Sequence, residues 1–116
     1  MSILADKSYA FAMRIVKSVE FLQNQKREFT MSKQLLRSGT AIGALIAESQ
    51  YAQSRLDFIN KLSISLKEAN ETKYWLRLLR DCGYLEASST KHMINDVDSI
   101  IKMLSSSIIT SKENMG

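Results

Sequence analysis

Apolar residues recur at three- and four-residue steps along nearly the whole chain, which is the spacing of amphipathic α-helices. The spacing predicts four helices, over residues 6–25, 31–53, 55–81 and 89–111. No segment shows the period-two alternation typical of a half-buried β-strand. We therefore expect an all-α protein. Because short connections favour antiparallel neighbours, residues 1–116 should form a single domain, an antiparallel up-down four-helix bundle.

Residues that start and stop helices support these bounds. The chain has no proline, a residue that breaks helix interiors. The Ser54–Asp57 pair resembles a capping box at the start of the third helix, and Gly83 suits the left-handed position after its end. Thr30 or Ser32 is the expected N-cap of the second helix. Residues 112–116 are expected to fray.

Small residues form a stripe along the second expected helix, where Gly39, Gly43 and Ala47 follow one another at four-residue spacing. Each interior glycine costs up to about 1 kcal/mol relative to alanine, a cost that close packing of another backbone offsets. Residues 40–47 are apolar or small on every side, which is typical of a helix buried on several sides. We therefore interpret the stripe as a surface for helix packing or subunit contact.

Positive charge is concentrated in the first half of the chain. The formal net charge is +4; residues 1–55 carry eight Lys/Arg against four Asp/Glu, and residues 56–116 carry eight of each. Such asymmetry indicates an anionic partner such as RNA or DNA. The alternative interpretation is a solvated helix face. The candidate nucleic-acid-binding residues are Lys7, Arg14, Lys17, Lys33 and Arg55.

Three charged residues, Arg37, Glu48 and Glu71, lie among apolar neighbours. We favour a structural ion pair that fixes the register of the helices, and loss of Arg37 from a buried pair should cost about 3–5 kcal/mol. The competing hypothesis is a general acid and base formed by the two glutamates. Nearby, the aromatic side chains of Tyr74 and Trp75 could stack on nucleic-acid bases. The favoured interpretation is that they lie in the core or in a contact between subunits.

The sequence lacks the features of an active site. Cys82 is the single cysteine, which excludes an internal disulfide, and it is expected to be half-buried; His92 is the single histidine and is expected near the surface. No phosphate-binding or dinucleotide-binding motif is present, so no cofactor, metal or enzymatic activity is expected. The chain begins without a signal-peptide pattern, and its longest apolar stretch is far shorter than the roughly 20 residues that span a bilayer. We expect a cytoplasmic protein with no membrane partner.

Residues 28–49 read EFTMSKQLLRSGTAIGALIAES. This stretch resembles the four-helix-bundle family encoded by intervening sequences in bacterial 23S ribosomal RNA genes. That family's Q-L-x-R-S/A motif, small-residue helix and A-E pair fall on Gln34, Leu35, Arg37, Ser38, Gly39, Ala41, Ile42, Ala47 and Glu48. The resemblance continues at Asp57-Phe58-Ile59, Leu62-Ser63-Ile64-Ser65, Glu68, Glu71 and Cys82-Gly83-Tyr84-Leu85. The chain departs from the pattern at Leu45, Ser49 and Lys67-Glu68, which indicates a subgroup.

The resemblance implies a four-helix bundle that assembles into a ring-like homopentamer. A related branch contains accessory proteins of diversity-generating retroelements, which bind a reverse transcriptase and nucleic acid through basic surfaces. From charge and resemblance together, we expect a non-enzymatic oligomeric bundle that binds RNA or DNA. A protein-binding scaffold without a nucleic-acid role is the alternative.

Overall fold

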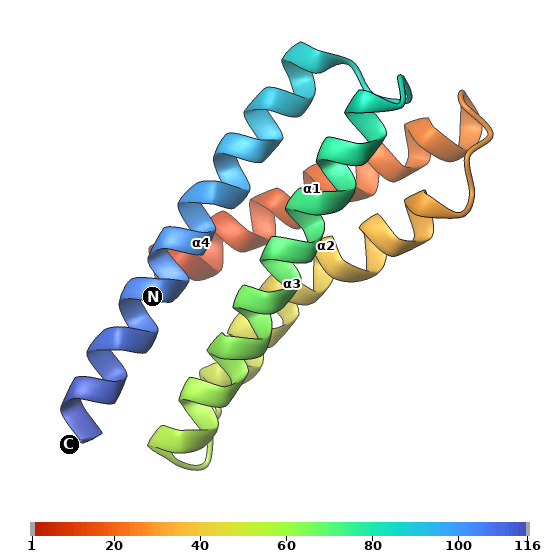
Figure 1. The fold of residues 1–116 in the computed structure, drawn as a ribbon. Helices are drawn as coiled ribbons and strands as arrows, with labels where there is room; N and C mark the ends of the chain where they lie inside the picture. The colour runs from red at the N-terminus through yellow and green to blue at the C-terminus, as the bar shows by residue number, and fades with distance from the viewer. Residues whose placement is uncertain (1, 116) are drawn as a thin grey trace.

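The computed structural model describes residues 2–115, which form four helices: α1 Ile3–Asn24, α2 Met31–Ser49, α3 Arg55–Asp81 and α4 Ala87–Met115. No strand occurs among them. Consecutive helices run antiparallel; α2 packs on both α1 and α3, and α3 packs on α4, while α1 and α4 meet over a shorter stretch (Figure 1). The expected all-α up-down bundle is therefore confirmed.

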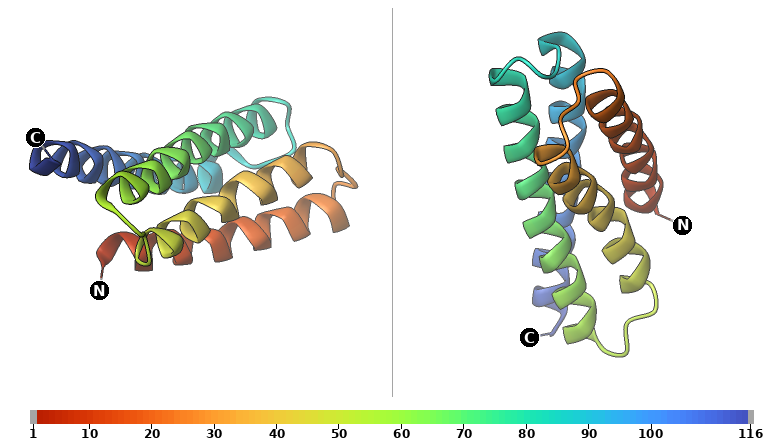
Figure 2. Two further views of the ribbon diagram at one scale, coloured as in Figure 1. Left: turned by 90° about the horizontal axis from the view of Figure 1, so that it is seen from below. Right: turned by 90° about the vertical axis from the view of Figure 1, so that its right-hand side faces the viewer.

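The bundle is elongated, measuring 49 × 22 × 21 Å. Two of its connections, the α1–α2 loop and the α3–α4 loop, lie at the same end (Figure 2). The α2–α3 loop and both chain ends lie toward the other end. This arrangement separates residues at the beginning of α2 from residues at the beginning of α3.

Each helix buries one stripe of apolar side chains in a common core. In α1 the stripe contains Phe11, Ile15, Val19 and Leu22. Val16, the residue after Ile15, is exposed although it is apolar. Neighbouring positions on a helix point about 100° apart, so a helix that buries Ile15 turns the next side chain toward solvent.

Both ends of α3 follow the expected local chemistry. The Ser54 hydroxyl accepts a hydrogen bond from the Asp57 amide at 3.0 Å. At the other end Gly83 has φ +83°, in the left-handed region. Its amide donates to Arg80 O and the Tyr84 amide donates to Leu79 O, at 3.0 and 2.9 Å, which is the Schellman pattern.

The other helix ends differ from the sequence-based expectation, because short-range hydrogen bonds move them. The Ser2 hydroxyl caps α1, so the helix starts at Ile3. Bonds of the tight i→i+3 type, from Tyr51 N–H to Glu48 O among others, end α2 at Ser49. The Glu86 carbonyl accepts the Thr90 amide, so α4 starts before the serines expected to begin it. Helix α4 continues to Met115, past its expected end at residue 111, while Gly116 lies outside the described residues.

A glutamate outside α2 caps that helix, in place of the expected Thr30 or Ser32. The buried Glu28 carboxylate accepts hydrogen bonds from the backbone amides of Thr30, Met31 and Ser32 at 3.1, 3.0 and 2.8 Å. The side chain of Thr30 makes no capping bond. An anionic group at this position satisfies free amides and interacts favourably with the helix dipole.

Candidate functional site

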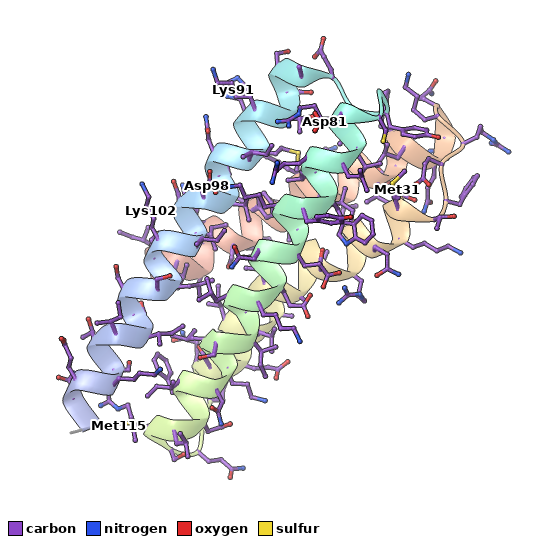
Figure 3. The ribbon with its side chains drawn as sticks, viewed as in Figure 1. Met31, Asp81, Lys91, Asp98, Lys102 and Met115 are labelled. Atoms are coloured by element: carbon purple, nitrogen blue, oxygen red, sulfur yellow. The ribbon has the colours of Figure 1, made fainter. Side chains whose placement is uncertain are left out.

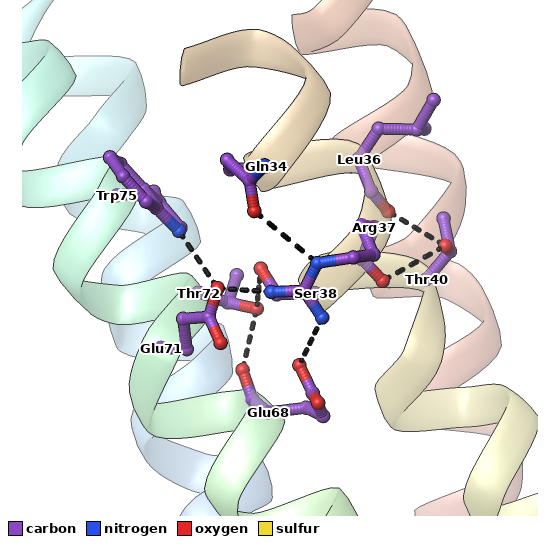
Figure 4. A network of polar contacts seen from close by, with 9 residues as sticks. All are labelled: Gln34, Leu36, Arg37, Ser38, Thr40, Glu68, Glu71, Thr72 and Trp75. Carbon is purple, nitrogen blue, oxygen red and sulfur yellow. Dashed lines mark hydrogen bonds and ion pairs between the residues drawn. The ribbon is translucent and has the colours of Figure 1, made fainter. Parts of the chain in front are cut away.

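The Arg37 network ties α2 to α3 through charged side chains (Figure 4). The Arg37 guanidinium pairs with Glu68 at 3.1 Å and with Glu71, and its Nε donates to Gln34 Oε1 at 3.3 Å. The Trp75 indole N–H donates to Glu71 at 3.1 Å. The hydrogen bond from Trp75, followed by that from Arg37, holds the pKa of Glu71 below its ordinary value. Glu71 is therefore an ionised structural group.

The buried ion pair expected from the sequence is only partly right. Arg37 does pair with Glu71, but its side chain is 49% exposed, and Glu68 is a second partner that the pattern did not reveal. Glu48 does not join the network; it pairs with Lys61 at 3.3 Å. Lys61 and Glu71 stand ten residues apart on α3, roughly 15 Å along its axis. The two glutamates thus lack the geometry of a general acid and base.

Because Arg37 is half-exposed, Arg37→Ala should lower the free energy of unfolding by about 1 kcal/mol, well short of the 3–5 kcal/mol of a buried pair. The loss leaves Glu68 and Glu71 without their shared cation. Urea unfolding followed by circular dichroism measures the change. Lys61→Ala, which breaks the more exposed pair with Glu48, serves as the control and should cost less. Complete unfolding of Arg37→Ala would contradict this account.

Beneath the network, α2 and α3 meet through small polar residues. The buried Thr72 and Ser38 hydroxyls lie 2.9 Å apart, and the buried Ser65 hydroxyl donates to Ile42 O at 2.9 Å. Each such group is hydrogen-bonded, as buried polar groups must be. The apolar pattern gave no sign of this contact, although the seven-residue spacing of Ser65 and Thr72 places both on one face of α3.

The glycine stripe of α2 packs against α1 of the same chain. A Cβ built on Gly39 would lie 2.8 Å from Ile15 Cγ1, and one on Gly43 would lie 3.3 Å from Ser8 Oγ. Ala47 is exposed at the end of the stripe. Close helix packing within the subunit therefore requires a glycine at Gly39, whereas the contact at Gly43 is less tight.

A shallow groove runs along the outside of this α1–α2 contact. Its lining is largely apolar and consists of Ala5, Asp6, Ser8, Tyr9, Ala12, Thr40, Gly43, Ala44 and Ala47. Exposed apolar side chains on α1, among them Tyr9 and Met13, extend the apolar surface.

On α3, Tyr74 is 55% exposed and stacks edge-on against the half-buried Trp75, with ring centroids 5.1 Å apart.

The five candidate cations do not gather on one surface of the chain. Arg14 pairs with Asp96 of α4. Lys33 lies at the start of α2 and Arg55 follows its far end, so the length of α2, about 27 Å at 1.5 Å per residue, separates them. Lys7 and Lys17 lie on α1 without an ion pair among residues 2–115. Other unpaired lysines, such as Lys91 and Lys102, point outward from α4 (Figure 3).

Two basic residues that the sequence analysis passed over, Lys26 and Arg27, stand in the α1–α2 loop beside exposed phenylalanines. The Lys26 ammonium lies 5.9 Å from the centre of the Phe21 ring, and the Arg27 guanidinium lies 5.6 Å from that of Phe29. The signal was available in the run KREF, where two adjacent basic residues are followed by one acid and one aromatic residue.

The remaining candidate residues stand apart from these features. Cys82 is exposed, not half-buried as expected. His92 is exposed as well. Within residues 2–115 no group of three or more His, Cys, Asp or Glu side chains is arranged to hold a metal ion. The helices of this part of the chain also lack an apolar stretch long enough to cross a membrane.

Comparisons with known proteins identify a sequence family and similar solved structures. The sequence model of the 23S rRNA-intervening sequence protein family matches residues 2–106. A crystal structure of a protein of unknown function from the S23 ribosomal protein family of Bacteroides thetaiotaomicron is similar, with a TM-score of 0.90 and 55% sequence identity. The similarity covers 91% of this chain and 98% of that one. No match is found among curated proteins.

Proposed function

Because the chain belongs to the family of 23S rRNA-intervening sequence proteins, we propose that it is a non-enzymatic, cytoplasmic helical bundle that forms an oligomer and binds RNA or DNA. The binding surface is basic and contacts the phosphate backbone. Phosphate contacts dominate the affinity of sequence-independent nucleic-acid binding. The family name itself carries no enzymatic activity.

The observation that carries the proposal is the state of the charges in residues 1–55. Two of the four carboxylates in this half interact with groups other than its cations: Glu28 caps α2, and Glu48 pairs with Lys61. Six of the eight cations have no ion pair among residues 2–115, so their charge is available to an anionic partner. These six are Lys7, Lys17, Lys26, Arg27, Lys33 and Arg55.

Self-assembly would bring these separated cations together. Five copies of a chain with net charge +4 carry about +20, which raises the local potential and the number of simultaneous phosphate contacts. The apolar α1–α2 groove, which is lined in part by the exposed Tyr9 and lies near the exposed Met13, supports a contact between copies, because contiguous exposed apolar surface marks interaction sites. A homopentamer is the expected assembly.

Fluorescence anisotropy of a labelled structured RNA at low salt tests the binding. Micromolar protein should bind it, with little dependence on its base sequence, and binding should weaken steeply as salt is added. Light scattering on the same sample should give a single pentameric mass. An RNA that stays free at micromolar protein and low salt would refute the nucleic-acid role.

A protein-binding scaffold is the second candidate, favoured by the exposed Tyr74 stacked on Trp75. Tyrosine and tryptophan are enriched at protein interfaces. A protein partner such as a reverse transcriptase belongs to this alternative. Retention of a single partner in nuclease-treated lysate, abolished by Tyr74→Ser, would favour the scaffold over the nucleic-acid role.

A further inference from the structure

The α1–α2 tip, defined as Phe21 in the last turn of α1 together with residues 25–30, is held rigidly from both helices. On the α1 side, the amides of Gln25 and Glu28 donate to Phe21 O and Leu22 O, each at 2.9 Å. On the α2 side, the Glu28 carboxylate accepts three amides and the Ser32 hydroxyl donates to Glu28 O at 2.8 Å. These bonds fix the tip in one conformation, so its exposed side chains are presented in a defined arrangement.

The tip exposes positive charge and aromatic surface together. The Phe21 and Phe29 side chains are 42% and 44% exposed, and Lys26 and Arg27 lie over their rings. Glu28 is the only carboxylate of the tip, and its bonds to the start of α2 turn it inward. The two cations are therefore not neutralised by a neighbouring acid within residues 2–115.

The backbone at Arg27 helps to define the shape of the tip. Its φ is +54°, in the left-handed region that side-chain-bearing residues adopt at a conformational cost. Glycine would occupy this position without that cost. The left-handed residue ends α1 and turns the chain toward α2, and it thereby sets where the Arg27 side chain projects.

We propose that the α1–α2 tip binds single-stranded nucleic acid, with Lys26 and Arg27 on phosphates and Phe29 and Phe21 stacking on bases. This inference rests on the proposed nucleic-acid role and assigns its contact surface. Cationic side chains beside exposed aromatic rings are how proteins hold single strands without sequence preference. Bases inside a duplex are already stacked on one another, so the phenyl rings favour a single strand over a duplex.

The test compares binding of a labelled 20-nucleotide single-stranded RNA to the full-length protein and to charge-matched variants. Lys26→Gln/Arg27→Gln should weaken binding at least tenfold at low salt. It should also reduce the slope of log affinity against log salt by about 1.4, because two phosphate contacts of about 0.7 each are lost. The control Lys102→Gln/Lys112→Gln removes the same charge from exposed positions on α4 and should weaken binding less than threefold.

A second variant separates stacking from charge. Phe29→Leu keeps an apolar side chain and should weaken single-strand binding about tenfold, leave the salt slope unchanged and affect a duplex of the same sequence little. Lys26→Gln alone leaves the backbone of Arg27 undisturbed and should weaken binding severalfold. It therefore reports on the tip even if the double variant unfolds.

Three outcomes would overturn the assignment of the tip. Equal weakening of RNA binding by the tip double variant and the α4 double variant would show that binding depends on charge spread over the surface. The nucleic-acid role would then stand, but its assignment to the tip would be wrong. Displacement of the RNA by polyglutamate at equal charge concentration would assign the tip to acidic polypeptides. Failure of the unmodified protein to bind any RNA would remove the proposed function itself.

Discussion

Glu28→Ala should lower the free energy of unfolding by about 2–3 kcal/mol, because it leaves the three amides at the start of α2 without their acceptor. These bonds involve a charged acceptor and are therefore stronger than neutral ones. The loss should appear as a lower urea midpoint with an unchanged m-value. Protein concentration must be held constant, since assembly contributes to apparent stability.

Acid should erase the difference between Glu28→Ala and the unmodified protein. Burial raises the pKa of Glu28, but hydrogen bonds from three backbone amides outweigh it, so the pKa lies below the ordinary 4.5. The folded state thus favours the ionised carboxylate, and its contribution is complete above pH 4.5. It is lost as the pH falls through the lowered folded pKa. Urea midpoints measured from pH 7 downward should converge in that range.

Glu20→Gln is the matched control for this prediction, because Glu20 is exposed on α1. Its free energy of unfolding should stay within about 0.5 kcal/mol of the unmodified value. A Glu28→Ala variant as stable as Glu20→Gln at neutral pH would show that the carboxylate is not the cap of α2.

The glycines of α2 should respond to alanine with different outcomes. Gly39→Ala should lower the free energy of unfolding by about 1–2 kcal/mol, since the overpacking cost exceeds the gain in helix propensity. The new Cβ would lie 2.8 to 3.0 Å from three atoms of Ile15, whose side chain is fully buried. A β-branched side chain in a helix has almost no other rotamer available.

Gly43→Ala is the counterpart with room to adapt. Its Cβ would meet Ser8 Oγ at 3.3 Å and Ser8 O at 3.4 Å, so small shifts suffice. The helix-propensity gain of about 1 kcal/mol should then keep this variant within about 0.5 kcal/mol of the unmodified protein. Urea unfolding of both variants measures the difference. Equal destabilisation by the two substitutions would contradict the close contact with Ile15.

The features predictable from the sequence are those governed by local chemistry. Apolar spacing identified the four helices, and Ser54 with Gly83 located both ends of α3. The cap of α2 was missed because Glu28 lies outside the helix and differs from the usual Ser, Thr, Asp or Asn. The partners of Arg37 were partly missed because i,i+4 spacing describes one helix, whereas Glu68 reaches Arg37 from another.

Candidate functional surfaces were harder to predict, because they too depend on which residues of different helices the fold brings together. Net charge located the basic half of the chain, but only the structure reveals that Arg14 is engaged by Asp96 and that Lys33 and Arg55 stand at opposite ends. Lys26 and Arg27 became candidates because the Glu28 carboxylate turns inward and the Arg27 backbone is left-handed. A count of charged residues reveals neither feature.

The salt dependence of single-stranded RNA affinity tests the central claim most directly. If the assembled protein binds the phosphate backbone through its unpaired cations, log affinity should fall linearly with log salt, with a slope of roughly −3 or steeper for four or more phosphate contacts. Anisotropy titrations at several salt concentrations give that slope. A slope near zero, or no binding at the lowest salt, would contradict a bundle that binds nucleic acid through its basic surface.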